Sequence, residues 1–261
     1  MKSIIELVQD MEKGKKNYDF FDINCWIPFK KDDSFLMLDS MEEYLSMLYS
    51  FGVKYAVVSN ERSFSCSPFV GNEEILTLID KCENMYAGVV LAPEIGFIQK
   101  NMRQYIDKLV EQKAVLFRMF PKKLNYSLKK WQVGDILEYM EYKRLPLVIW
   151  HTETDWDTIN EICAEYPELP VIIEGSEKKL LYHNRAYITL LAKYKNFYIE
   201  THNFVQYLGY EYIVDKLGID RLIFGSYFPY NSPNSSILPI ITANINHSEK
   251  SKIASENFLK L

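Results

Sequence analysis

The chain is poor in the residue types that most often bind transition metals or form disulfides. It has four cysteines, Cys25, Cys66, Cys82 and Cys163, and no two of them form a C-x-x-C pair. This spacing excludes a zinc knuckle, and it is typical of a reduced, cytosolic protein. Histidine is as scarce, with four residues in 261.

Runs of like charge and long apolar runs are also missing. The net charge is -5, and consecutive lysines form no run longer than a pair, such as Lys15-Lys16 or Lys122-Lys123. The first six residues already include Glu6, which is typical of neither a signal peptide nor a membrane span. We therefore expect no nucleic-acid partner, no membrane partner and a cytoplasmic location.

No short repeat, low-complexity run or flexible linker divides the chain. We therefore expect a single domain over residues 1–261. The length suits one barrel of roughly 250 residues, and a chain of this size buries enough surface to fold without disulfides or metals.

Eight apolar, β-rich runs recur along the whole length, and several are continuously hydrophobic, as in parallel strands covered on both faces. They are Tyr18 to Asn24, Lys54 to Ser59, Ala87 to Ala92, Ala114 to Phe120, Leu147 to His151, Val171 to Glu174, Phe197 to Thr201 and Arg221 to Gly225.

Helical periodicity fills the gaps between these runs, for example at Met41, Tyr44, Leu45 and Leu48. Strict strand-helix alternation predicts an α/β fold, a (β/α)8 TIM barrel. An open doubly wound sheet is the alternative, but it usually has a glycine-rich first turn. This chain has Cys25-Trp26-Ile27-Pro28 there.

Local signals place the ends of several elements. A second periodic set comprises Ile98, Met102, Tyr105, Ile106 and Leu109. Thr154 and Asp157 predict a helix-capping box, and Gly52 and Gly218 predict helix C-caps. Long strand-to-helix loops are expected at Cys25 to Leu38, Asn60 to Gly71 and Tyr227 to Ser235, and an extra N-terminal helix with Ile4, Ile5, Val8 and Met11 is expected to plug the other end of the barrel.

Polar residues stand at the C-terminal ends of the expected strands, where barrel enzymes assemble their sites. They are Asp22, Asn24, Arg118, His151, Glu174, Glu200, His202 and Tyr227. Such a set could hold a metal, an anion or a polar substrate.

Several stretches resemble the amidohydrolase-related family of TIM-barrel hydrolases, the branch with many decarboxylases and lactone hydrolases. They are Leu217 to Pro229, which resembles that branch's last strand, Tyr166 to Gly175, Lys195 to Thr201, the closing Lys252 to Leu261, and Phe20 to Trp26. The resemblance implies a metal-dependent hydrolase fold, with small-molecule substrates and often a homodimer.

The departures from this family lie at its metal ligands. The family's H-x-H at the end of strand 1 is Asn24-Cys25-Trp26 here, its sixth-strand histidine is Glu174, and its strand-8 aspartate is Tyr227. Only His151 stands where the resemblance places a ligand. The fourth strand offers Arg118, which cannot be carbamylated as the lysine of some members is.

We therefore predict a depleted metal site and no tightly bound cofactor, although a weak divalent metal such as zinc is not excluded. A rebuilt site would use His151, Glu174 and His202, with Glu200 as an alternative ligand.

The candidate catalytic residues are His151, as general base, with Glu174 and Arg118, whose guanidinium would hold a carboxylate or phosphate. The candidate substrate-binding residues are Asp22, Asn24, Trp26, Glu200, His202 and Tyr227. Each also has a structural interpretation. His151 could bond a main-chain carbonyl, Arg118 could form an internal ion pair with Glu174 or Asp22, and Asp22 could fix the first strand. His183 and His247 are expected on the surface.

Two functions follow from this sequence. The first is a hydrolase or lyase of a small polar carbon substrate such as a lactone, amide or carboxylate. The second is a catalytically silent relative that binds a small ligand or has a regulatory role.

Overall fold

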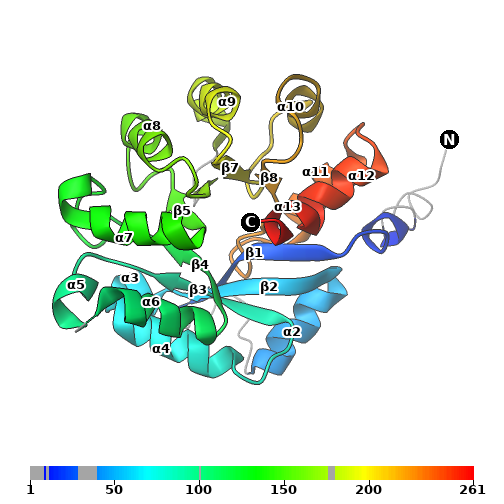
Figure 1. Cartoon of the computed structure of the whole chain (residues 1–261). Helices are drawn as coiled ribbons and strands as arrows, with labels where there is room; N and C mark the ends of the chain where they lie inside the picture. The colour runs from blue at the N-terminus through cyan, green and yellow to red at the C-terminus, as the bar shows by residue number, and fades with distance from the viewer. Residues whose placement is uncertain (1–8, 10–11, 29–39, 100, 176–179) are drawn as a thin grey trace.

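The computed structural model describes residue 9 and residues 12–28, 40–99, 101–175 and 180–261. Eight parallel strands form one sheet in the order in which they occur in the chain (Figure 1). They are β1 (Phe20–Ile27), β2 (Val53–Asn60), β3 (Met85–Val90), β4 (Ala114–Arg118), β5 (Leu147–Trp150), β6 (Val171–Glu174), β7 (Phe197–Glu200) and β8 (Leu222–Ile223).

The sheet closes on itself between β1 and the segment around β8. The Ile23 N–H donates to the carbonyl of Phe224 at 3.2 Å, and the Trp26 N–H donates to the carbonyl of Phe228 at 2.8 Å. Cys25 and Phe228 form a parallel bridge beside these bonds. The fold is therefore the (β/α)8 barrel that the sequence predicts, and the open sheet is excluded.

Helices surround the ring of strands, one or more after each strand (Figure 1). They are α2 (Met41–Ser50), α3 (Arg62–Ser65), α4 (Pro68–Ile79), α5 (Ile95–Ile98), α6 (Met102–Glu111), α7 (Lys130–Lys143), α8 (Trp156–Glu165), η1 (Leu180–His183), α9 (Asn184–Lys193), α10 (Gly209–Leu217), α11 (Asn234–Thr242), α12 (His247–Ser251), η2 (Lys252–Glu256) and α13 (Asn257–Leu259).

Two apolar layers hold the barrel together. The larger lies between the strands and the helices and includes Val58, Ile75, Leu137 and Ile173. The smaller one fills the barrel interior, with buried side chains such as Ile23, Val57, Leu116, Val148 and Ile172. Because successive strand residues point to opposite faces, runs that are apolar throughout supply both layers at once.

The N-terminal end of the barrel is covered by the end of the chain. The ring of Phe258 in α13 packs edge-on against Phe21 of β1, with 5.1 Å between centroids, and Leu261 packs on the same interior cluster. Figure 1 shows the C-terminus near the middle of the ring of strands. The helix with Ile4, Ile5, Val8 and Met11 that was expected at this end lies outside the described residues, although residues 12–15 are helical.

Several element boundaries differ from those predicted by the sequence. The cap of α8 is Asp155, whose side chain accepts from Thr158 N at 2.7 Å, so the capping box predicted at Thr154 and Asp157 is wrong by one residue. Ile98 ends α5 and does not begin α6. The long loop predicted at Asn60 to Gly71 is largely helical, because α3 and the first turn of α4 occupy it.

Gly218 is the C-cap of α10, as predicted, whereas Gly52 directly follows Phe51, the C-cap of α2. Gly52 and Gly218 have φ of 91° and 80°, a left-handed conformation that costs glycine little because it has no Cβ. Among the described residues, no helix combines the length and the hydropathy that a membrane crossing requires.

Candidate functional site

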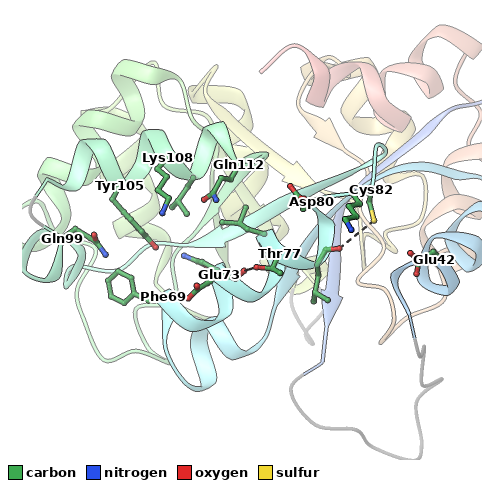
Figure 2. Close-up of a pocket in the computed structure, with 15 residues that line it drawn as sticks. Glu42, Phe69, Glu73, Thr77, Asp80, Cys82, Gln99, Tyr105, Lys108 and Gln112 are labelled. Atoms are coloured by element: carbon green, nitrogen blue, oxygen red, sulfur yellow. Dashed lines mark hydrogen bonds between the residues drawn. The ribbon is translucent and has the colours of Figure 1, made fainter.

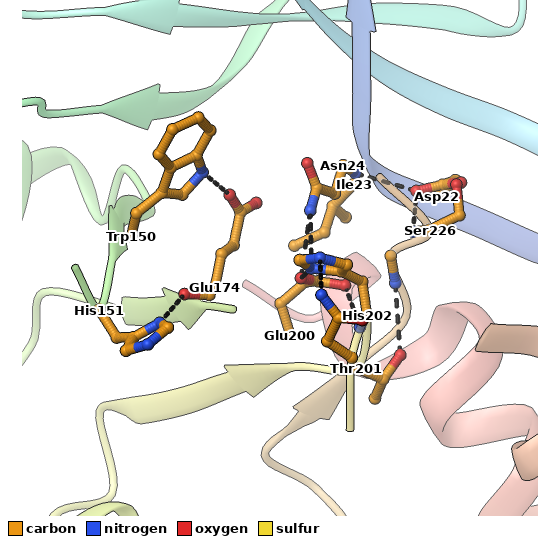
Figure 3. Close-up of polar contacts among 12 residues, drawn as sticks. Asp22, Ile23, Asn24, Trp150, His151, Glu174, Glu200, Thr201, His202 and Ser226 are labelled. Carbon is orange, nitrogen blue, oxygen red and sulfur yellow. Dashed lines mark hydrogen bonds and ion pairs between the residues drawn. The ribbon is translucent and has the colours of Figure 1, made fainter. Parts of the chain in front are cut away.

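All nine candidate site residues are buried. Seven have no exposed surface, His151 is 5% exposed and Tyr227 is 6% exposed. Asp22 and Asn24 lie inside β1, which continues to Ile27, so the prediction that they stand at the end of the first strand is wrong. The others lie at or just beyond the C-terminal ends of β1, β4, β5, β6, β7 and β8, and the barrel brings together residues that are up to 205 positions apart, from Asp22 to Tyr227. Buried polar groups require partners, and the network they form is the candidate site (Figure 3).

Arg118 and Glu174 form an ion pair with no exposed side-chain surface on either partner. Arg118 Nη1 donates to Glu174 Oε2, Nε donates to Ser59 Oγ at 2.9 Å, and Nη2 donates to the carbonyl of Ile23 at 3.1 Å. The guanidinium carbon also lies 4.6 Å from the centroid of the Trp26 ring. The internal ion pair that the sequence offered as the structural interpretation of Arg118 is therefore present.

The two carboxylate oxygens of Glu174 have different surroundings. Oε2 accepts from Trp150 Nε1 at 2.9 Å as well as from Arg118. Oε1 is buried and has no hydrogen-bond partner among the described residues. Burial raises the pKa of Glu174, and the positive charge of Arg118 opposes that rise.

Glu200 and His202 form a second buried pair. His202 Nδ1 lies 3.0 Å from Glu200 Oε2, and the main-chain N–H of His202 donates to Glu200 Oε1 at 2.5 Å. Asn24 Nδ2 also donates to Glu200 Oε2, at 3.2 Å, and Asn203 Nδ2 lies 2.8 Å from His202 Nε2. Both ring nitrogens of His202 therefore have partners.

Gly225 makes room for this pair. A Cβ on Gly225 would lie 2.2 Å from Glu200 Oε1, a distance that no side chain tolerates. The glycine just after β8 thus lets the Glu200 carboxylate reach its position beside His202.

His151 directly follows β5, and two contacts hold it against the end of β6. Its main-chain N–H donates to the carbonyl of Glu174 at 3.0 Å, and its Nδ1 lies 3.2 Å from the same oxygen. A carbonyl oxygen can only accept, so Nδ1 carries a proton and Nε2 is the nitrogen that can take one up. Figure 3 shows the ring turned toward this carbonyl.

His183 is a neighbour that the sequence did not identify. Its ring lies 5.0 Å from that of His151, and its Nδ1 accepts from Trp156 Nε1 at 3.0 Å. It is half-buried, so it is only partly on the surface, where the sequence places it. Its position in η1, beyond a strand end by several residues, gave no signal in the sequence. His247 is exposed, as expected, and contacts Tyr18.

Asp22 fixes the first strand through main-chain hydrogen bonds. Its Oδ1 accepts from the main-chain N–H groups of Asn24 at 2.9 Å and Ser226 at 3.0 Å, which joins β1 to the segment after β8. Burial raises the pKa of Asp22 from 3.8 to about 6.

Aromatic rings line the same end of the barrel. Trp26, Phe120, Trp150 and Tyr227 form one buried cluster with Val90, and Phe64 packs against it. The exposed ammonium of Lys123 lies 4.8 Å from the Phe64 ring and 5.4 Å from the Trp150 ring. We call these four buried rings and Phe64 the aromatic cluster.

The residues present do not fit the metal that the resemblance implies. Asn24 Oδ1 accepts from Trp26 Nε1 at 2.7 Å, and the Trp26 ring lies against the Arg118 guanidinium. The rebuilt set of His151, Glu174 and His202 does not fit either, because Glu174 Oε2 and both His202 nitrogens are engaged with other side chains. Within the described ranges, no group of three or more histidine, cysteine, aspartate and glutamate side chains is arranged to hold a metal ion.

A groove of about 830 Å³ lies on the outside of the barrel, away from these residues (Figure 2). Phe69, Glu73 and Thr77 of α4 line one side of it, and Tyr105 and Lys108 of α6 line the other. It contains none of the strand-end residues, so the candidate site is defined by the buried network and not by this groove.

Comparison with known proteins gives the fold but no close relative. No protein-family model matches the chain, and no curated protein matches it. Solved structures do match. A candidate amidohydrolase from Staphylococcus aureus has a TM-score of 0.71 at 15% identity, over 93% of this chain and 100% of that one.

Two aromatic-acid decarboxylases match over similar lengths. The 5-carboxyvanillate decarboxylase from Novosphingobium aromaticivorans, with bound manganese and 3-methoxy-4-hydroxy-5-nitrobenzoic acid, has a TM-score of 0.70 at 11% identity, over 95% of this chain and 99% of that one. The 2,6-dihydroxybenzoate decarboxylase from Rhizobium has a TM-score of 0.67 at 14% identity, over 93% and 98%. The resemblance predicted from the sequence is confirmed at the level of the fold.

Proposed function

We propose that this protein is a hydrolase or lyase that acts on a small polar carbon compound at the C-terminal end of the barrel. The observation that carries the proposal is the network of buried polar side chains at six strand ends, in a barrel whose interior below them is apolar. Sequestered polar groups at this end are what barrel enzymes use to bind and convert substrates. The fold neighbours, which include decarboxylases, support the same class of reaction.

His151 is the proposed general base. The Glu174 carbonyl fixes its tautomer, so that Nε2 is the basic ring nitrogen, and histidine is the side chain most often used as a general base. A base held in one orientation loses little entropy when the substrate arrives. Nearby His183 is the second imidazole that a transferred proton would meet.

Glu174 and Arg118 support this base. Glu174 supplies the carbonyl that orients His151, and its buried Oε1 is available to accept a hydrogen bond from a hydroxyl or amine of the substrate. Arg118 is a positioning residue that holds the Glu174 carboxylate, since each of its three guanidinium nitrogens already has a partner in the protein. The remaining candidates, Asp22, Asn24, Trp26, Glu200, His202 and Tyr227, shape the wall of the site.

A substrate carboxylate would bind better to Lys123 than to Arg118. The Lys123 ammonium is exposed above the aromatic cluster, where a ring-bearing or planar carboxylate would bring opposite charge and apolar surface together. We therefore favour carboxylates among the lactone, amide and carboxylate substrates. The cytoplasmic location and the homodimer stay predictions. The four cysteines form no disulfide.

The test is a panel of lactones, amides and aromatic and aliphatic carboxylates, assayed with wild type, His151→Gln and His247→Gln. We expect turnover that falls at least ~100-fold in His151→Gln, the lower range of general-base contributions. His247→Gln, a change on the outer surface, should leave turnover at the wild-type level. Turnover that is equal in wild type and His151→Gln would contradict His151 as the base.

A ligand-binding protein without turnover is the second candidate. It is favoured by the mutual pairing of Glu200, His202 and Asn24, which leaves these groups satisfied without a substrate. The same panel separates the two functions, because a silent binder would be thermally stabilised by one compound and convert none of them.

A further inference from the structure

We infer that Arg118 is the resident cation of this barrel, and that its guanidinium takes the electrostatic place of the metal ion to which the family resemblance points. The inference concerns how the site is held together, and it stands whether or not the protein turns over a substrate.

The contacts of Arg118 span the barrel. The residue ends β4, and its three guanidinium nitrogens bind Ile23 of β1, Ser59 of β2 and Glu174 of β6. A divalent ion in a metal-dependent barrel would likewise bind side chains from several strands at one positive charge. Here one covalently attached charge joins them.

Two of the positions that the resemblance assigns to metal ligands are bound by this guanidinium. Glu174, in the place of the sixth-strand histidine, is its ion-pair partner, and the ring of Trp26, in the place of the second strand-1 histidine, makes a cation-π contact with it at 4.6 Å. Both Glu174 and Trp26 are residues that stabilise a nearby positive charge. A carboxylate and an indole face both favour a cation, and an indole cannot ligate a metal.

The surrounding backbone is shaped for the guanidinium. A Cβ on Gly88 of β3 would lie 2.3 Å from Ser59 Oγ and 3.4 Å from Arg118 Nε. The glycine therefore leaves the space in which Ser59 and Arg118 meet. Trp150 Nε1 then donates to the same Glu174 oxygen as Arg118, so the carboxylate accepts two donors.

A divalent ion would be disfavoured beside this arrangement. Arg118 is fully buried, where its charge is poorly screened, and Glu174 Oε2 already accepts from it and from Trp150 Nε1, so a metal ion binding this oxygen would have to displace both donors.

The first arm of the test measures metal in wild type purified without chelator, by elemental analysis, and the melting temperature with and without EDTA. We expect well under one equivalent of manganese, zinc or iron, and no change in melting temperature on adding EDTA. About one equivalent of metal, lost to EDTA together with a fall in melting temperature, would overturn the inference.

The second arm compares Arg118→Met, Glu174→Gln and the double variant, with exposed Arg103→Met as a control. Removing only the arginine leaves a buried carboxylate uncompensated, so Arg118→Met should melt roughly 10 °C below wild type. Replacing Glu174 as well removes that charge, and the double variant should recover part of the loss. Arg103→Met should have the same melting temperature as wild type.

A double variant that is no more stable than Arg118→Met would show that Arg118 does not balance Glu174, and the inference would fall. If Arg118→Met does not fold, the double variant still decides, since the inference requires that it fold. The chelation arm is independent of every variant.

Discussion

At the scale of single residues, the most informative group is the carboxyl of Asp22. It is fully buried, and its Oδ1 accepts two main-chain hydrogen bonds that join β1 to the segment after β8. Burial raises its pKa to about 6, although the two hydrogen bonds oppose that rise. The folded protein therefore binds a proton at Asp22 more tightly than the unfolded chain does.

This difference predicts a pH dependence of stability that Asp22→Asn should remove. Since the folded pKa of about 6 lies above the ordinary 3.8, the stabilising contribution is complete below about pH 4 and is lost as the pH rises through 6. The loss amounts to ~3 kcal/mol at 1.36 kcal/mol per pKa unit. Asparagine keeps the accepting oxygen and does not titrate.

Urea denaturation of both proteins from pH 4 to 8 measures this. The free energy of unfolding of wild type, minus that of Asp22→Asn, should fall across the range. A difference that stays constant with pH would mean that the carboxyl titrates alike in the folded and unfolded states.

At the scale of elements, Asn72 shows how one side chain fixes a helix on a strand. In α4 it is 1% exposed, its Nδ2 donates to the carbonyl of Val90 at 2.8 Å, and its Oδ1 accepts from the N–H of the same residue at 2.8 Å. The Asn72 amide thus satisfies the main-chain N–H and carbonyl of Val90, the last residue of β3, as a neighbouring strand would. The site depends on this, because β3 lies between β2 and β4, which carry Ser59 and Arg118.

We predict that Asn72→Leu lowers the free energy of unfolding by ~2–3 kcal/mol, because leaving a buried main-chain group without its partner costs about 1–3 kcal/mol. Leucine has the same branching at Cγ as asparagine and is larger, so none of the loss would come from a cavity. Glu73→Gln, exposed on the same helix, is the matched control and should change little. Equal denaturation midpoints for the two variants would show that Asn72 is not holding β3.

At the scale of the whole molecule, the barrel is finished differently at its two ends. Polar pairs fill the C-terminal end, while the rings of Phe21 and Phe258 and the side chain of Leu261 cover the N-terminal end. The two ends thus differ energetically, since the polar end carries pairs that cost desolvation and the apolar end supplies burial.

Phe258→Ala should therefore destabilise the whole barrel, by ~3 kcal/mol or more, because truncating a largely buried phenylalanine removes its contacts and leaves a cavity. Leu259→Ala, next to it and 66% exposed, should cost little. Both are measured by urea denaturation. If the two variants unfold alike, the apolar end is closed by something other than Phe258.

The fold could be predicted from the sequence because its signals are local. Runs such as Val171 to Glu174 are apolar throughout, helices follow each of them, and Gly52 and Gly218 mark where helices end. These patterns depend on neighbouring residues alone, so they survive without knowledge of the tertiary structure. Boundaries were misplaced where the pattern was short or interrupted, as at the cap Asp155, at Ile98 and in the helical stretch between Asn60 and Gly71.

The sequence by itself also determined which polar residues gather at one end of the barrel, because parallel strands end on the same side. It could not decide which of them bind one another. That Arg118 pairs with Glu174, that Glu200 holds His202, and that His183 lies beside His151 depend on strand register and side-chain direction across the barrel. Those are long-range geometric quantities with no periodic signal, and only the closed tertiary structure decided them.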